Sequence, residues 1–201
     1  MASEDSVSNP RYPFGLPMGT VRGFLSLLIC SFFWIVLLSS SDAKPPLAHF
    51  FLLALVLLAF ASSPGADDKN NGATLPWLMR VLFLGGSAAV VIYCLANDAD
   101  QFKTRITPNL DEFKQWWVSF MACIIGGFAG GLIARVLLGR RSYAFLTFRA
   151  WLSVIGMIML GIELALFVSL MSADPDKYNN FFHTWQAIQI TVVSAYFATR
   201  S

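Results

Sequence analysis

The chain has little charge for its length. Only 13% of its 201 residues are Asp, Glu, Lys or Arg, whereas soluble domains carry about 25%. The formal net charge is +2, and the basic residues are scattered between apolar segments. Nucleic-acid binding requires a concentrated basic surface, so we expect no nucleic-acid partner.

Residues that serve metal or nucleophilic chemistry are also scarce. The chain has two histidines, and its three cysteines, Cys30, Cys94 and Cys123, fall in different apolar segments without a CxxC pair. It contains no GxSxG, HExxH or phosphate-loop motif. We therefore expect no enzyme, no metal and no cofactor. We expect the cysteines to pack as small hydrophobic side chains.

Hydrophobic residues are abundant instead, at 56% of the chain with a mean hydropathy of +0.61. They gather into blocks that approach the roughly 20 helical residues needed to cross a hydrocarbon core of about 30 Å. This pattern predicts an all-α, polytopic integral membrane helical bundle with five or six transmembrane helices. A polar tail at residues 1–19 precedes one domain, residues 20–201. The predicted spans are residues 20–40, 45–62, 76–96, 116–138, 144–171 and 181–198.

Helix-start signals support these bounds. Thr20 is a suitable N-cap, and prolines at 45–46 and 76 suit the first turn of a helix. The longest connection is residues 97–114. Near its end, Asn109 is followed three residues later by Glu112, which is a capping arrangement for the next helix.

The first and last spans each have an alternative. Arg22, the apolar run after it and Ser41-Asp42-Ala43 resemble a signal peptide with its cleavage site; we expect an uncleaved first span. Residues 181–198 include His183, Gln186 and Gln189 among apolar residues and could lie at the membrane surface. A surface helix normally carries Lys or Arg on its polar face, and this segment carries none, which favours a sixth span.

The distribution of basic residues predicts the orientation. With the N-terminus inside, eight basic residues fall on the inner side and five on the outer side. The inner ones are Arg11, Arg22, Lys69, Arg80, Arg135, Arg140, Arg141 and Arg149. The outer ones are Lys44, Lys103, Arg105, Lys114 and Lys177. We expect a plasma or inner membrane protein with a cytoplasmic N-terminus, and Arg200 joins the inner side if the sixth span exists.

Small residues mark a predicted packing surface. The run MACIIGGFAGGLIAR has four glycines within six residues, although each glycine costs a helix about 1 kcal/mol relative to alanine. Spacing by four aligns Ala122, Gly126, Gly130 and Ala134 in one ridge, which Gly127 and Gly131 widen. Small residues allow close helix contact in lipid. The ridge could pack against a span of the same chain, for which Gly85 to Ala89 in the third span is our expected partner, or it could mediate dimerisation.

Glu163 is the one acidic residue well inside a predicted span. A lone carboxylate there is costly, so it must be protonated, paired or in contact with water. On the predicted topology His49 and Tyr93 are the nearest polar candidates, and we expect a contact between Glu163 and His49. That contact could be a structural hydrogen bond or could handle a proton or ion.

Four arginines flank the turn between the fourth and fifth predicted spans: Arg135, Arg140, Arg141 and Arg149. We expect Arg135 and Arg149 to extend towards the lipid head groups, and the four together could form a head-group pocket.

Two functional hypotheses follow. The first is a non-catalytic structural or assembly subunit of a larger membrane complex, with the lipid bilayer and other membrane subunits or a second copy of the chain as partners. The alternative is an oligomeric channel or a small-solute or ion transporter, in which Glu163, His183, Gln186 and Gln189 line a water-accessible path.

Overall fold

The computed structural model describes residues 20–39, 44–61, 74–108, 110–139, 142–171 and 175–199. Within these ranges every regular element is an α-helix. The helices are α1 (Thr20–Leu38), α2 (Leu47–Ala61), α3 (Thr74–Asn97), α4 (Ala99–Ile106), α5 (Leu110–Leu138), α6 (Tyr143–Met171) and α7 (Pro175–Ala198). The predicted polar tail lies outside the described residues.

Each predicted span coincides with one of these helices. The apolar runs make up most of α1, α2, α3, α5 and α6, and the mixed segment at residues 181–198 makes up most of α7. Pro76 lies in the first turn of α3, where the missing N–H breaks no helical hydrogen bond. The expected capping residue Asn109 lies outside the described residues, although α5 does begin at the next residue, Leu110.

The prediction of a loop over residues 97–114 was wrong for most of its length, because α4 lies within it and α5 begins before its end. Asp98 has an extended backbone (φ −157°, ψ 92°), and its side chain accepts a hydrogen bond of 2.9 Å from the N–H of Gln101. This satisfies one of the free N–H groups at the start of α4. Lys103 and Arg105 lie in its last turn, where the helix dipole favours cations.

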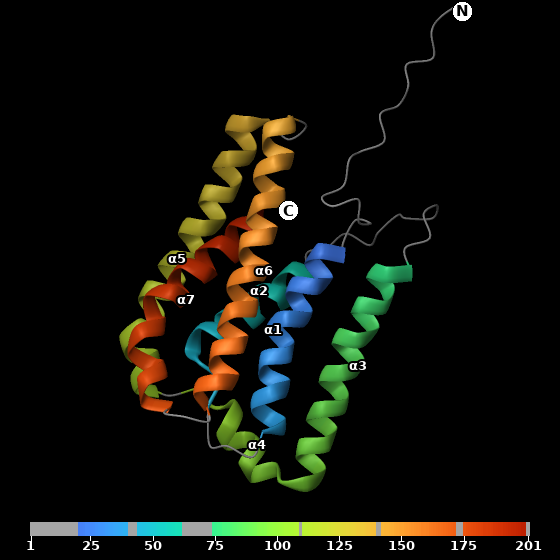
Figure 1. The fold of residues 1–201 in the computed structure, drawn as a ribbon, viewed down its shortest axis with the longest axis vertical. Helices are drawn as coiled ribbons and strands as arrows, with labels where there is room; N and C mark the ends of the chain where they lie inside the picture. Colours follow the sequence, from blue (N-terminus) through green and yellow to red (C-terminus); the bar gives the residue numbers. More distant parts are fainter. Residues whose placement is uncertain are drawn as a thin grey trace, which may run out of the picture.

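The long helices alternate in direction along the bundle. In Figure 1, α1, α3 and α6 run from the upper to the lower end, and α5 and α7 return, while α4 lies at the lower end between α3 and α5. The beginning of α1 and the end of α7 consequently lie towards the same half of the molecule.

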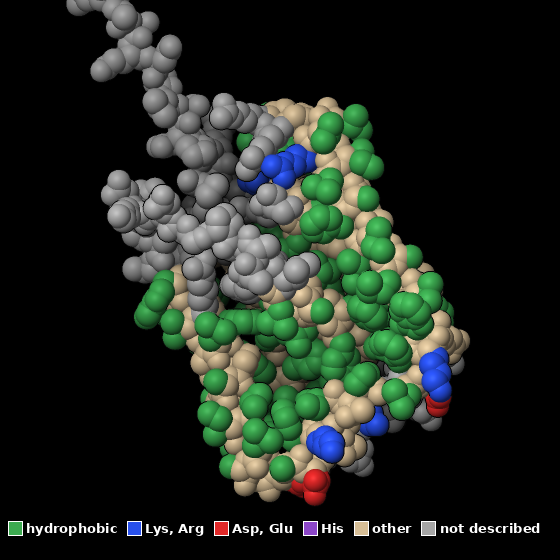
Figure 2. Space-filling model, turned by 180° about the vertical axis from the view of Figure 1, so that it is seen from behind, with side chains coloured by type: hydrophobic (Ala, Val, Ile, Leu, Met, Phe, Trp, Pro, Cys, Tyr) green, Lys and Arg blue, Asp and Glu red, His purple; other side chains and the backbone are tan. Residues whose placement is uncertain are grey.

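Several helices are long and apolar enough to cross a membrane. Within the described residues, four meet both conditions: Thr20–Leu38, Trp77–Asn97, Phe113–Leu138 and Tyr143–Ser169. The apolar stretch Leu47–Leu57 in α2 is shorter, and α7 does not belong to this group. Figure 2 shows a surface whose middle is hydrophobic, with the visible charged side chains towards its two ends. The fold is therefore an all-helical bundle compatible with membrane insertion.

The last helix occupies an interior position. α7 packs against α5, α6 and α2, and Figure 1 shows it crossing between α5 and α6. Its Ile190 and Val193 join a buried cluster with Leu25 and Ile29 of α1 and Leu52 of α2. Neighbouring helices thus cover much of α7, which explains how it tolerates more polar residues than a lipid-facing helix does.

The expected packing of the third predicted span on the fourth was wrong. Among the described residues α3 contacts α1 and α4 but not α5. Gly86 of α3 faces the ring of Trp34 in α1, so that a Cβ at this glycine would lie 2.6 Å from the ring. The indole N–H of Trp34 also points at the hydroxyl of Ser87, with a donor–acceptor distance of 3.3 Å. Trp34 fills the space that we had expected α5 to fill.

Candidate functional site

A group of polar side chains is buried in the centre of the bundle. Glu163 comes from α6, His49 from α2, and Gln186 and Gln189 from α7, where a spacing of three places them on one face. All four are at most 1% exposed. We call this group the polar cluster. Polar groups so deeply buried are stable only when other polar groups compensate the loss of water.

Glu163 is the centre of the polar cluster. The amide Nε2 of Gln186 donates a hydrogen bond of 3.1 Å to Oε1 of the carboxyl group. Nε2 of His49 lies 3.9 Å from Oε2, which is an ion-pair distance but too long for a hydrogen bond. The structure thus places Glu163 beside His49, as the sequence led us to expect, and adds Gln186 as its hydrogen-bonding partner.

Aromatic rings hold His49 in place. Its imidazole stacks on Phe32 of α1 at a centroid distance of 3.7 Å, and Phe33 approaches it edge-on at 6.5 Å. Phe32 packs in turn on Phe167 of α6 at 4.4 Å. The imidazole is therefore fixed between α1 and α6, with one ring nitrogen directed towards Glu163.

Part of the polar cluster has no hydrogen-bonding partner. Among the described residues neither the oxygen nor the nitrogen of the Gln189 side-chain amide has one, and the same holds for Oε1 of Gln186 and Nδ1 of His49. Each such buried group costs about 1–3 kcal/mol. The cluster is chemically capable of holding a proton or a small polar species. Within the described residues, however, no three His, Cys, Asp or Glu side chains gather to hold a metal ion.

Two residues that the sequence associated with this site lie elsewhere. Tyr93 of α3 is 60% exposed and faces a different cavity, near the ends of α1 and α4. His183 stacks on Trp116 of α5 at a centroid distance of 4.5 Å and is only partly buried. The path predicted from Glu163, His183, Gln186 and Gln189 therefore does not include His183.

The glycine ridge of α5 divides into two faces. A Cβ at Gly127 would lie 2.0 Å from Oγ of Ser194 and 2.4 Å from the carbonyl oxygen of Thr191, both in α7. A Cβ at Gly131 would lie 2.5 Å from the carbonyl oxygen of Ala195. These two glycines allow α7 to lie directly on the α5 backbone.

The other face of the ridge points outward. Ala122, Gly126 and Gly130 are exposed, and Ala134 is partly buried. A Cβ at Gly126 or Gly130 would meet nothing within 4 Å. We call Ala122, Gly126 and Gly130 the outer ridge. The sequence showed a single broad ridge, and only the position of α7 divides it.

The structure describes two of the four arginines that we expected near the lipid head groups. Arg135 in the last turn of α5 and Arg149 near the start of α6 are both partly buried, while Arg140 and Arg141 lie outside the described residues. Their contact with lipid stays a prediction.

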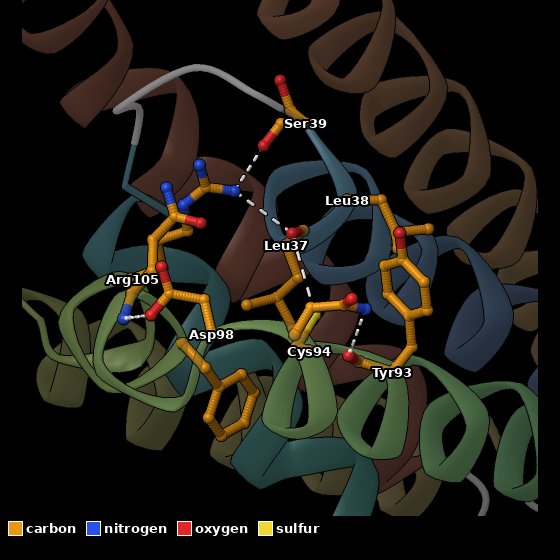
Figure 3. A pocket seen from close by; sticks show the side chains of 10 residues that line it. Leu37, Leu38, Ser39, Tyr93, Cys94, Asp98 and Arg105 are labelled. Carbon is orange, nitrogen blue, oxygen red and sulfur yellow. Dashed lines mark hydrogen bonds between the residues drawn. The ribbon is translucent and has the colours of Figure 1, made fainter.

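Sequence reasoning missed a second polar site, built around Arg105. This residue is 5% exposed and lines a cavity of about 310 Å³ between the ends of α1, α3 and α4 (Figure 3). We had counted Arg105 only as an outer basic residue. The pair Asp98 and Gln101, spaced as in a capping box, could have indicated that a helix holds it.

Comparisons with protein-family models, curated proteins and solved structures gave no match to this chain. The functional argument therefore depends on the geometry of these sites.

Proposed function

We propose that the chain is a multi-pass membrane protein without catalytic activity that serves as a structural or assembly subunit of a larger membrane complex. The observation that carries this proposal is that packed helices enclose the polar cluster. Glu163 is 0% exposed and its carboxyl group accepts a hydrogen bond from Gln186, so packed helices surround the most reactive group of the core. A side chain that no substrate reaches supports a role in holding the bundle together.

The lipid-facing surface supports the same proposal. The apolar stretches of α3 and α5 are mostly not buried inside the bundle. Only 6% of the stretch in α3 and 11% of the stretch in α5 is buried. The outer ridge lies within the α5 stretch, flanked by the exposed side chains of Ile125 and Ile133. Small residues beside larger apolar ones let another transmembrane helix approach closely. The outer ridge is the proposed contact for a partner subunit or for a second copy of this chain.

The proposed topology has the N-terminus on the cytoplasmic side of a plasma or inner membrane. The excess of basic residues on that side, eight against five, supports it. The alternating directions of the helices in Figure 1 are consistent with it. In this arrangement Arg135 and Arg149 lie near the inner head groups, and the Arg105 cavity lies at the outer ones.

Co-purification tests the assembly role. The wild-type protein is extracted in mild detergent, and mass spectrometry identifies the membrane proteins that remain bound. A double variant, Gly126→Leu with Gly130→Leu, fills the outer ridge and is expected to release the partner while the bundle stays folded. Gly85→Leu is the matched control, because it makes the same change at an exposed glycine of α3 with nothing within 4 Å. A wild-type protein that purifies alone as a monomer, or a double variant that keeps its partner, contradicts the proposal.

One observation favours the alternative of a channel or small-solute transporter. Gln189 is fully buried and both polar atoms of its amide lack partners among the described residues, so a hydrated path past Glu163 would satisfy them. Single cysteines at positions 186 and 189, placed in a variant without Cys30, Cys94 and Cys123, distinguish the two roles. Reaction with a water-soluble thiol reagent in intact membranes supports the transport role. Resistance at both positions, with a cysteine at the exposed Gln101 reacting as the control, supports the assembly role.

A further inference from the structure

α5 and α6 project beyond the beginning of α1. Figure 1 shows both helices extending past α1 at the upper end. A Cβ at Gly156 of α6 would lie 3.7 Å from the side chain of Leu25 in α1, so these two residues lie at one level of the bundle. Thirteen residues of α6 precede Gly156 (143–155), and five residues of α1 precede Leu25 (20–24). The difference of eight residues carries α6 about 12 Å beyond the beginning of α1.

α5 projects by a similar length beyond the end of α7. A Cβ at Gly131 of α5 would lie 2.8 Å from Cβ of Ala198, which is the last residue of α7. Residues 132–138 of α5 continue past this contact, and seven helical residues span about 10 Å. We call residues 132–138 of α5 and 143–150 of α6 the tip. Neither α1 nor α7 reaches far enough to cover it.

The tip is apolar and exposed. Val136 is 81% exposed, Leu137 is 78% exposed and Tyr143 is 79% exposed. The tip has seven residues from α5 and eight from α6, and of these only Arg135 and Arg149 are charged. Contact between water and so much apolar surface is unfavourable, and such patches mark protein or membrane contacts. The tip therefore requires an apolar environment.

The distribution of the exposed surface favours acyl chains over one partner helix. Val136 and Leu137 are consecutive and point about 100° apart around α5, yet both are almost fully exposed. A packed neighbour covers one stripe of a helix, whereas lipid chains can surround it. The exposed surface also continues along the side of α5 that bears Ile125 and Ile133, which are 63% and 56% exposed. The tip thus extends the lipid-facing surface of the bundle.

The bundle consequently presents two hydrophobic lengths. The apolar stretch of α1, Thr20–Leu38, has 19 residues, or about 28 Å, which matches a hydrocarbon core of about 30 Å. The stretches Phe113–Leu138 and Tyr143–Ser169 have 26 and 27 residues, or about 40 Å. A tilt of the whole bundle shortens both lengths in the same proportion, so it does not remove the difference. A bilayer can accommodate a longer apolar stretch by thickening locally.

We propose that the tip binds long acyl chains in the leaflet that surrounds the beginning of α1, so that the bilayer is thicker beside α5 and α6 than beside α1. Arg135 and Arg149 lie three and six residues from the ends of their helices, within reach of the head groups of the thickened leaflet. The protein thereby selects long-chain lipids as neighbours. This surface is independent of the proposed assembly role, because the tip lies beyond the outer ridge of α5.

The depth of the tip provides the first test. Tyr143→Cys is made in a variant without the three native cysteines, labelled with an environment-sensitive fluorophore and reconstituted into bilayers of dimyristoleoyl-, dioleoyl- or dierucoyl-phosphatidylcholine, which increase in thickness in that order. Quenching by a nitroxide lipid is expected to exceed quenching by aqueous iodide in the dioleoyl bilayer, and iodide quenching should fall further in the dierucoyl bilayer. The same label at Phe24→Cys in α1 should report lipid in all three bilayers, and at Gln101→Cys in α4 it should report water. Equal iodide quenching at position 143 in all three bilayers places the tip in water and overturns the proposal.

Lipid selectivity provides the second test. Native mass spectrometry of the full chain, released from bilayers with equal amounts of dimyristoleoyl and dierucoyl lipid, is expected to find more of the longer lipid bound. Val136→Ser with Leu137→Ser removes exposed apolar surface from the tip and is expected to remove this preference at unchanged helix content. Leu84→Ser with Ile92→Ser is the matched control on α3, where the two residues are 65% and 66% exposed, and it should keep the preference.

Three results overturn the assignment to lipid. The first is a wild-type chain that binds both lipids equally, and the second is a tip variant that keeps the preference. The third is a label at Tyr143→Cys that neither quencher reaches in native membranes although iodide reaches it in pure lipid, because a protein partner then covers the tip. The assembly role is judged separately, by co-purification with the outer-ridge variant.

Discussion

Two neighbouring glycines of α5 are expected to respond oppositely to the same substitution. In Gly127→Ala the new methyl group would lie 2.4 Å from the carbonyl oxygen of Thr191, about 1 Å closer than the 3.4 Å at which ordinary contact begins. A backbone carbonyl cannot rotate away, so α5 and α7 must separate. In Gly126→Ala the methyl group meets nothing within 4 Å.

The magnitudes follow from two opposing effects. Alanine gains about 1 kcal/mol over glycine in helix propensity at either position. At Gly127 this gain is opposed by an overpacking cost of about 1–3 kcal/mol and by dispersion energy lost along a contact opened by about 1 Å. We therefore expect Gly127→Ala to lower the free energy of unfolding by up to about 2 kcal/mol, and Gly126→Ala to leave it unchanged or raise it by up to about 1 kcal/mol.

Thermal unfolding in one mild detergent, followed by circular dichroism, measures the difference. A change of 1 kcal/mol corresponds to about 2–4 °C in a chain of this size. Gly127→Ala should therefore melt several degrees below Gly126→Ala, which should melt at or slightly above the wild type. Gly131→Ala should follow Gly127→Ala and Gly130→Ala should follow Gly126→Ala. If Gly127→Ala melts at or above Gly126→Ala, the division of the ridge into an inner and an outer face is wrong.

Two further substitutions test the core and the α1–α3 contact. Glu163→Gln keeps an acceptor for Gln186 and should melt within a few degrees of the wild type, whereas Glu163→Ala leaves that buried amide without its acceptor and should lose about 1–3 kcal/mol in the same assay; equal stability of the two variants would show that the hydrogen bond contributes little. Gly86→Leu should displace Trp34 from α3 and shift the tryptophan emission spectrum, while Gly85→Leu, at an open position, should not; identical spectra for both variants would contradict the packing of α1 on α3.

The long helices could be predicted from the sequence because their apolar runs are continuous and their starts carry Pro, Thr or capping pairs. Glu163 and His49 could be paired because a buried carboxylate needs a polar neighbour and few were available. Both inferences depend on local composition and on a simple cost of burial.

The remaining features depend on which helices are neighbours, and sequence periodicity does not determine that. Gly127 and Gly126 are chemically identical, and only the path of α7 decides which one is covered. α3 was assigned to the wrong neighbour because a patch of small residues accepts a large ring such as Trp34 as readily as a second small-residue face. α4 was missed because eight residues with three charged side chains give no apolar run; its N-cap at Asp98 was its clearest sign.

The most direct test of the membrane-embedded bundle is extraction of the native protein from its membranes. After a wash in alkaline carbonate, the chain should stay in the membrane pellet, and a mild detergent should then release it as a folded helical protein. Recovery of the chain in the carbonate supernatant, folded and monodisperse in buffer without detergent, would contradict the membrane-embedded bundle and both roles proposed for it.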